Sequence, residues 1–180
     1  IHRSLIKNGY GNNENGGYFL TPNRDELNYL DSEKVDVWFK KNLPDVVIIA
    51  AAKVGGIIAN NNFPADFILE NIQIQTNLIK TSWKYNVKRL LFLGSSCIYP
   101  KQSKQPIKEE YLLSGYLEST NEQYALAKIC GIKMCESLRI QYDFDCISLM
   151  PTNLFGPGDN YHKENSHVMA SLIRKFSEGA

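Results

Sequence analysis

The sequence lacks any strong excess of charge and any cysteine pattern that would indicate a metal site. Lysine and arginine together number 20, against 19 aspartate and glutamate residues, so the net charge is +1 and no basic field favours nucleic acid. The four cysteines form no C-x-x-C pair and have no histidine at the spacing of a zinc ligand. These absences argue against a nucleic-acid-binding protein and a zinc-held fold. Cysteines without a pairing pattern favour a reducing, cytoplasmic setting.

Long apolar runs are also missing. No stretch reaches the ~18 residues that a membrane span needs, and the first residues do not have the pattern of a signal peptide, so we expect no membrane partner. The chain begins with Ile1 rather than Met, and its first residues look like the second half of an amphipathic helix. We therefore expect the 180 residues to be part of a longer protein.

What the sequence does contain is a regular alternation of strand-like and helix-like segments. Apolar β runs are expected at 45–52, 89–96 and 144–150, with a short strand at 18–22. Amphipathic helices are expected at 31–42, 64–86, 119–142 and 165–176, with Asp31 as an N-cap and Thr120 and Gln123 at capping-box spacing. The alternation predicts an α/β fold, a doubly wound parallel sheet covered on both faces, in a single domain over 1–180.

One helix carries a pair of residues that could perform acid–base chemistry. Tyr124 and Lys128 lie four residues apart, so both side chains point to one side of the helix, about 6 Å apart along its axis. An ammonium group near a phenol favours the phenolate, so we expect Lys128 to lower the pKa of Tyr124. Taken alone, this spacing is a weak signal, because many ordinary surface helices carry it by chance.

The motifs at the strand ends make this pair more specific. GSSCIYP follows the 89–96 run, AAAKVGG follows the run before it, and MPTNLFGPG follows the run after it. The chain resembles the extended short-chain dehydrogenase/reductases, in which these motifs occur in the same order. The resemblance implies a Rossmann-like NAD(P)-binding fold in which Ser95 and Tyr124 bind the reacting oxygen. Lys128 would hold the nicotinamide ribose and tune the tyrosine.

A finer resemblance implies a two-step reaction. LGSSCIYPK, the PADF segment and the NSHV segment are similar to the branch that epimerises a GDP-linked 4-keto-6-deoxy sugar at C3 and C5 and then reduces C4 with NADPH. Carried over, Cys97 is the epimerisation base and His167 the acid. Cys97 could instead be a packing residue and His167 a helix cap. His162 lies close to His167 in the sequence, and Ser96 could replace Ser95.

The same resemblance implies the binding residues. An arginine after the second strand suits the 2′-phosphate of NADP(H), although Asp25 beside it weakens this argument. The implied cofactor contacts are Arg24, Asp25, Glu26, Leu27, Asn28, Ala51, Ala52, Lys53, Leu93, Gly94, Ser95, Ser96, Lys128, Pro151, Thr152, Asn153, Leu154 and His167. The implied contacts to the GDP-sugar substrate are Asn153, Val168 and Lys175, the last standing where the family usually has an arginine.

Two parts of the family pattern are not found. The fingerprint G-x-x-G-x-x-G with its first strand is missing, and so is the C-terminal substrate domain, so the NADP-binding domain is expected to be incomplete. A 4-epimerase or a 4,6-dehydratase is an alternative, but dehydratases carry an Asp-Glu pair where this chain has Ser96 and Cys97. A truncated, non-catalytic dimerisation or binding module is the other alternative. Helices 67–84 and 121–142 are expected to form a homodimer interface.

Overall fold

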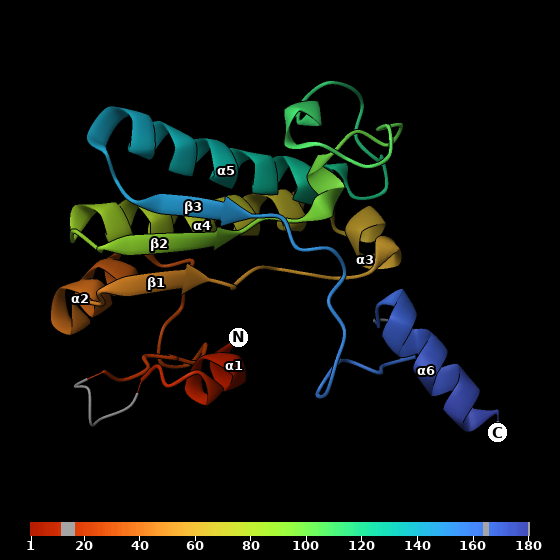
Figure 1. Cartoon of the computed structure of the whole chain (residues 1–180), viewed down its shortest axis with the longest axis horizontal. Coiled ribbons are helices and arrows are strands. Elements are labelled where there is room, and N and C mark those ends of the chain that lie inside the picture. The colour runs from red at the N-terminus through yellow and green to blue at the C-terminus, as the bar shows by residue number, and fades with distance from the viewer. Residues whose placement is uncertain (12–16, 164–165, 180) are drawn as a thin grey trace.

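The structure is a computed structural model that describes residues 1–11, 17–163 and 166–179. Its centre is a parallel sheet of three strands in the order β1-β2-β3, with β1 at Val46–Ile49, β2 at Arg89–Leu93 and β3 at Cys146–Leu149. Figure 1 shows the three strands side by side with their carboxyl ends pointing the same way. The predicted α/β class with a parallel sheet is confirmed.

Two long helices cover one face of the sheet. α4 spans Pro64–Lys84 and α5 spans Glu122–Tyr142, and they pack along each other behind the strands (Figure 1). The inward side chains of the strands, Leu90, Phe92 and Ile49, are at most 2% exposed and form the core with residues of these helices. At the usual value of about 25 cal/mol per Å² of apolar surface, this burial is the main source of stability.

The opposite face is only partly covered. Among the described residues, no helix packs over β3 on that side, and Ile147 and Leu149 are 38% and 49% exposed. The expectation that both faces are covered is therefore not met over β3. Because β3 carries apolar side chains on this face as well as on the core face, its sequence is a continuous apolar run. A strand with one solvated face would instead alternate apolar and polar residues.

The helix starts follow from local chemistry in two cases. α2, at Ser32–Asn42, begins at Asp31, whose carboxylate accepts hydrogen bonds from the backbone N–H groups of Glu33 and Lys34 at 3.1 Å each, as predicted. α4 begins with Pro64 in its first turn, where the missing N–H has no partner to lose. The remaining helices are α1 at His2–Lys7, α3 at Ile57–Asn62 and α6 at Val168–Glu178. Two short 3-10 turns, η2 at Ser96–Ile98 and η3 at Glu109–Tyr111, follow β2.

Two local predictions are wrong. Residues 18–22 form no strand, because no neighbouring strand of the described chain offers them a ladder of hydrogen bonds. The capping box at the start of α5 is also absent, since the Thr120 hydroxyl donates to the Glu118 carboxylate at 3.4 Å and Asn121 makes no side-chain cap. The expected start of the last helix, residue 165, lies outside the described residues.

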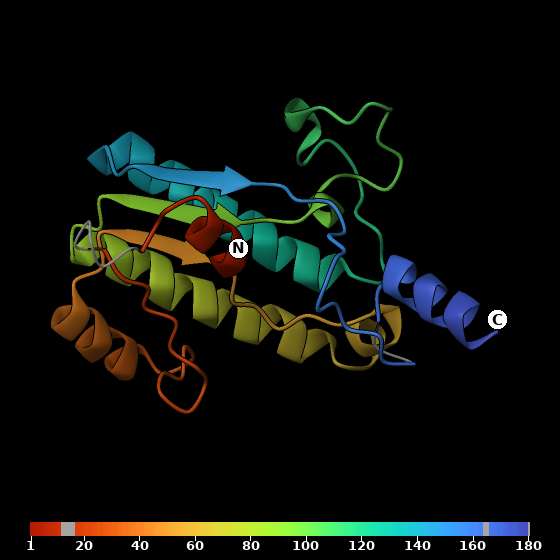
Figure 2. The ribbon, with the colours of Figure 1, turned by 60° about the horizontal axis from the view of Figure 1, so that its bottom comes forward.

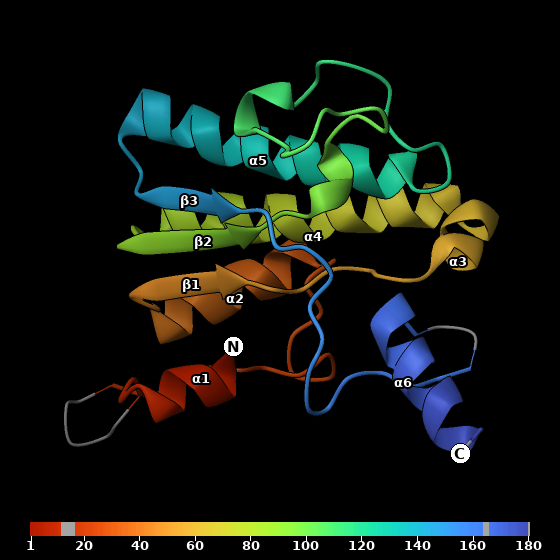
Figure 3. The same ribbon diagram turned by 45° about the vertical axis from the view of Figure 1, so that its right-hand side comes forward.

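α6 lies beyond the carboxyl ends of the strands, apart from the sheet. Figures 1, 2 and 3 agree on this position from three directions. The strand ends, the first turns of α5 and the start of α6 therefore share one end of the molecule.

Among the described residues, no helix is long and apolar enough to cross a membrane.

Candidate functional site

The site is built where β2 ends and α5 begins. After Leu93 the chain makes the tight turn η2, which carries Ser96 and Cys97 and packs against α5. α5 presents Tyr124 and Lys128 from its first two turns. The structure thus brings the predicted residues Ser95, Cys97, Tyr124 and Lys128 to one place, in three consecutive pieces of the fold.

Lys128 is the most constrained of these residues. Its side chain is only 5% exposed, and its ammonium group donates a hydrogen bond to the Leu93 carbonyl at 2.8 Å. The same nitrogen lies 5.0 Å from the centre of the Phe92 ring and 5.7 Å from the centre of the Tyr124 ring. Burial lowers the pKa of Lys128 to about 8, because a charged amine is poorly solvated there. One hydrogen bond to Leu93 leaves two N–H donors for a ligand.

The expected lowering of the tyrosine pKa is wrong in this arrangement. Burial, and to a smaller extent the charge of a Cys97 thiolate, raise the pKa of Tyr124 to about 12. The ammonium of Lys128 is directed to the Leu93 carbonyl rather than to the phenol oxygen. Tyr124 is therefore a protonated acid at neutral pH, which is the form that a proton donor needs.

The Cys97 thiol is partly buried at the start of this site. Burial raises its pKa, while the Ser95 hydroxyl and the charge of Lys128 oppose the shift. The thiol is therefore protonated at neutral pH, and the expectation that its ordinary pKa lies close enough to neutral for ready exchange needs correction. The Ser95 hydroxyl, the backbone N–H of Cys97 itself and the charge of Lys128 favour its thiolate form.

The neighbouring strand ends reach this centre through close contacts. The backbone N–H of Gly94 donates to the Leu149 carbonyl at 2.8 Å, and a Cβ on Gly94 would lie 2.6 Å from the Met150 sulfur. A larger residue at Gly94 would displace the Met150 side chain and press on the Leu149 carbonyl, so glycine favours this approach of the β2 and β3 ends. On the β1 side, a Cβ on Gly55 would lie 3.0 Å from Phe67, whose ring meets Tyr124 edge-on at 6.4 Å.

The loop after β1 is fixed by α4. The amide of Asn71, 3% exposed, accepts from the Lys53 N–H at 2.9 Å and donates to the Lys53 carbonyl at 3.0 Å. The Lys53 ammonium is held by Glu70 at 2.5 Å and Asp66 at 3.2 Å. The predicted cofactor residues Ala51, Ala52 and Lys53 thus lie on an ordered loop, with the lysine charge paired to carboxylates.

Other predicted binding residues lie farther from this centre. Arg24, Asp25 and Glu26 form an exposed turn just before α2, and Leu27 is buried in the core at 2% exposure. The segment after β3 is progressively exposed, from the half-buried Pro151 to Leu154 at 69%. The other predicted binding residues of these two segments are also exposed: Asn28, Thr152 and Asn153.

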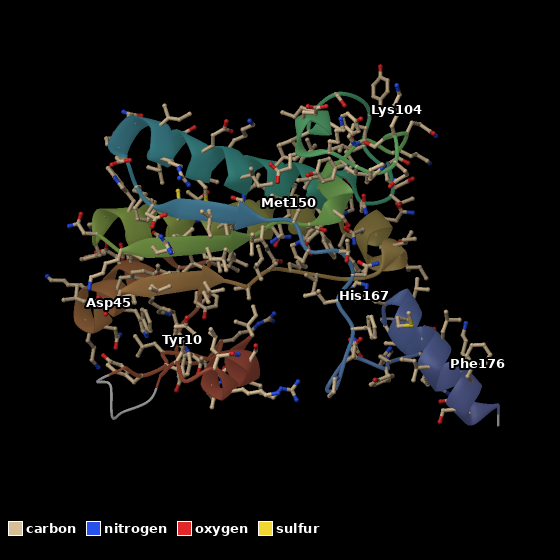
Figure 4. All side chains as sticks on the ribbon, in the orientation of Figure 1. Tyr10, Asp45, Lys104, Met150, His167 and Phe176 are labelled. Carbon is tan, nitrogen blue, oxygen red and sulfur yellow. The ribbon has the colours of Figure 1, made fainter. Side chains whose placement is uncertain are left out.

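His167 lies at the same end of the molecule without joining the group. It is the N-cap residue of α6, is exposed, and makes no side-chain cap hydrogen bond. Figure 4 shows it on the strand-end side, beyond Met150. Val168, 70% exposed, and the exposed Lys175 follow it on α6. Within the described residues, none of these three hydrogen-bonds to Ser95, Cys97 or Tyr124.

Sequence reasoning missed the buried polar residues of α4. The stripe of α4 that faces α5 and the strand-end loops includes Asn71 and Gln75, both 3% exposed. Their spacing of four residues, in line with the apolar Phe67 and Leu78, was the available signal. A polar side chain repeated on the buried face of a helix indicates a specific partner.

Comparison with known proteins identifies the family. The model of the NAD dependent epimerase/dehydratase family matches residues 5–180. The chain belongs to this family. It is 55% identical over 179 residues to the probable GDP-L-fucose synthase 1 of Oryza sativa subsp. japonica, covering 99% of this chain and 53% of the relative. It is 58% identical over 155 residues to the GDP-L-fucose synthase of Escherichia coli, covering 86% and 48%.

A solved structure extends the similarity to three dimensions. A GDP-L-fucose synthetase from Naegleria fowleri bound to NADP superposes with a TM-score of 0.85 at 28% identity, covering 98% of this chain and 53% of that one. The chain therefore spans about half the length of the relatives that it matches. For this epimerase/dehydratase family member, the strand-end motifs and the Tyr124–Lys128 pair are present in that half.

Proposed function

We propose that this protein is a GDP-L-fucose synthase, which converts GDP-4-dehydro-6-deoxy-D-mannose to GDP-L-fucose by 3,5-epimerisation followed by NADPH-dependent reduction at C4. The observation that carries the proposal is the grouping of Ser95, Cys97, Tyr124 and the buried Lys128 at the end of β2. The identity of 52–58% to GDP-L-fucose synthases of plants and bacteria supports the same reaction.

The residues of the site fit an NADP cofactor. Lys128 has two N–H donors beyond its bond to Leu93, as the two hydroxyl groups of a ribose require. Gly94 and its neighbours leave the strand end without a bulky side chain. When bound, NADPH supplies the hydride for C4. In this proposal the cofactor contacts Ser95, Ser96 and the loop at Ala51–Lys53. Arg24 would bind the 2′-phosphate of the adenosine ribose.

The proton chemistry follows from the pKa values. Tyr124, with its pKa raised to about 12, keeps its proton until the C4 oxygen becomes strongly basic, and Ser95 donates a second hydrogen bond to that oxygen. In its thiolate form, the minor form at neutral pH that the positive charge of Lys128 and the Ser95 hydroxyl favour, Cys97 removes a proton from the carbon next to the ketone. His167 is proposed as the acid on the opposite side, and Asn153, Val168 and Lys175 as substrate contacts. Positive charge on Lys175 suits a diphosphate, although without the two-pronged geometry of arginine.

Each alternative function is disfavoured by a particular feature of the site. A 4,6-dehydratase would carry an Asp-Glu pair where Ser96 and Cys97 stand, so elimination is disfavoured. A 4-epimerase has no use for a thiol beside the strand-end serine. A non-catalytic binding module would have no use for Tyr124 and the Cys97 thiol beside Lys128, whose burial costs about 3 kcal/mol of unfolding free energy.

The experiment supplies the 180-residue chain with GDP-4-dehydro-6-deoxy-D-mannose and NADPH in D₂O. We expect Tyr124→Phe to slow NADPH oxidation by about 10²-fold or more and to leave deuterium exchange at C3 and C5 in place. Cys97→Ser should slow exchange and leave NADPH binding intact. A wild-type chain that neither exchanges nor oxidises NADPH contradicts the proposal for this polypeptide.

Assembly and location are part of the same proposal. We infer a homodimer through the outer faces of helices 67–84 and 121–142, where Leu69, Leu126 and Ile140 are 66%, 40% and 79% exposed. Light scattering on the wild type and on Leu126→Glu measures this, with a monomeric variant expected. A monomeric wild type would contradict it. A cytoplasmic location is proposed from the reduced cysteines and the nucleotide-sugar substrate.

A further inference from the structure

A buried glutamine ties the two long helices together one turn from the site. The Gln75 side chain on α4 is 3% exposed, and its amide nitrogen donates to the Ala127 carbonyl on α5 at 2.6 Å. That carbonyl belongs to the peptide bond of Lys128. The hydrogen bond therefore fixes the backbone from which the lysine side chain projects.

The same contact depends on a glycine. A Cβ on Gly131 would lie 2.8 Å from the Gln75 amide oxygen and 2.4 Å from the Phe92 ring, so any larger residue would push both away. The Phe92 ring, fully buried, also lies under the Lys128 ammonium, 5.0 Å from its centre. Gln75, Gly131 and Phe92 thus surround the turn of α5 that carries Lys128 on its buried side.

We propose that Gln75 is a positioning residue, which acts through the Ala127 carbonyl to hold Lys128 over Phe92 and against the Leu93 carbonyl. Its importance for catalysis depends on the proposed function. Its effect on the lysine does not, because the position and solvation of Lys128 can be measured without turnover. A glutamine that only stabilised helix packing would leave the lysine environment unchanged.

The test compares Gln75→Leu with Gln73→Leu. Gln73 lies two residues away on the exposed side of α4 and also makes one side-chain hydrogen bond, to the Asn77 amide oxygen at 3.0 Å, so it is a matched control. NMR titration of ¹³C-labelled lysine, with the Lys128 signal assigned by its loss in Lys128→Met, gives the lysine pKa in each variant. We expect Gln75→Leu to raise the pKa of Lys128 by about half a pH unit or more toward its ordinary value, as water reaches the loosened turn. Gln73→Leu should not change it.

A second variant keeps the proposal testable if Gln75→Leu does not fold. In Gln75→Glu the protonated acid can donate to the Ala127 carbonyl, whereas the carboxylate cannot. Its urea midpoint should match the wild type near pH 5 and fall below it near pH 8, because burial raises the pKa of a carboxyl into this range. An unchanged Lys128 titration in Gln75→Leu, or a Gln75→Glu midpoint that matches the wild type at both pH values, overturns the proposal.

The outcome is separate from that of the proposed function. If the wild-type chain shows no turnover but Gln75→Leu shifts the lysine titration, the positioning role stands and the activity fails. If turnover is present, Gln75→Leu should weaken NADPH binding and the reduction rate together, and Gln75→Glu should recover both as the pH falls.

Discussion

The buried lysine of the site should destabilise the fold, and this can be measured. Lys128 has its pKa lowered from 10.5 to about 8, a difference of about 2.5 pH units, or about 3 kcal/mol of unfolding free energy at neutral pH. Lys128→Met removes this charge and keeps a flexible apolar chain over the Phe92 ring. It also removes the hydrogen bond to the Leu93 carbonyl, which is worth about 1 kcal/mol. We expect Lys128→Met to be about 2 kcal/mol more stable than the wild type at pH 7, and inactive.

The difference in unfolding free energy between Lys128→Met and the wild type should change with pH, and this change identifies the buried charge as its cause. The folded wild type releases the Lys128 proton near pH 8, whereas the unfolded chain keeps it to about pH 10.5. The unfolded state therefore binds more protons between these values, and wild-type stability rises relative to the variant as the pH increases. The advantage of Lys128→Met should be complete below about pH 8; by about pH 10.5 only the lost hydrogen bond to Leu93 should remain, leaving the variant about 1 kcal/mol less stable than the wild type.

Urea unfolding at pH 7, 9 and 10.5, followed by far-UV circular dichroism, measures the gap. Lys133→Met is the matched control, since it removes a lysine from the same helix whose side chain is 48% exposed and which pairs with Glu136 on the surface. A Lys128→Met variant less stable than the wild type at pH 7, with a gap that does not change with pH, would refute the reasoning.

Three further predictions concern the residues around the lysine. Gly131→Ala should lower the unfolding free energy by about 1–3 kcal/mol, measured by urea unfolding, because its Cβ would meet the Phe92 ring at 2.4 Å. Asn71→Ala should cost about 1–3 kcal/mol and increase amide hydrogen exchange at Lys53, because the loop after β1 loses both of its hydrogen bonds. Alkylation of Cys97 by iodoacetamide, followed by mass spectrometry, should be slow at pH 7 and accelerate only above the ordinary thiol range, because burial raises its pKa; fast labelling at pH 7 would contradict this.

Much of the fold could be predicted because local signals and tertiary packing agree. The apolar runs at 45–52 and 89–96 contain β1 and β2, and the N-cap at Asp31 sets the start of α2. Residues 18–22 have strand-like composition but no strand, because a strand needs a hydrogen-bonded neighbour that composition cannot supply. Thr120 likewise has capping-box spacing but donates to Glu118 instead.

Motif order predicted that Ser95, Cys97, Tyr124 and Lys128 lie together, and the structure places these four at the end of β2, with His167 apart on α6. The electrostatics of the group could not be predicted in this way. The spacing of Tyr124 and Lys128 does not reveal where the ammonium points, and the Leu93 carbonyl, which decides it, comes from a segment 35 residues away in the sequence. The raised pKa of Tyr124 follows from burial and from the nearby Cys97, both tertiary properties.

The residues that break the pattern of an apolar core point to function. Asn71, Gln75 and Lys128 all lie within the helix layer at 3–5% exposure, where leucine would be more stable. Each one directs a polar atom to a backbone group at the strand-end side of the molecule: the Lys53 loop, the Ala127 carbonyl and the Leu93 carbonyl. Other buried polar side chains of α4 serve local packing, since Asn77 donates to the Tyr29 carbonyl and Ser82 to the Leu78 carbonyl of its own helix. The three that converge on one end of the sheet, next to Tyr124 and Cys97, are explained if the helix pair exists to hold a reactive site in place.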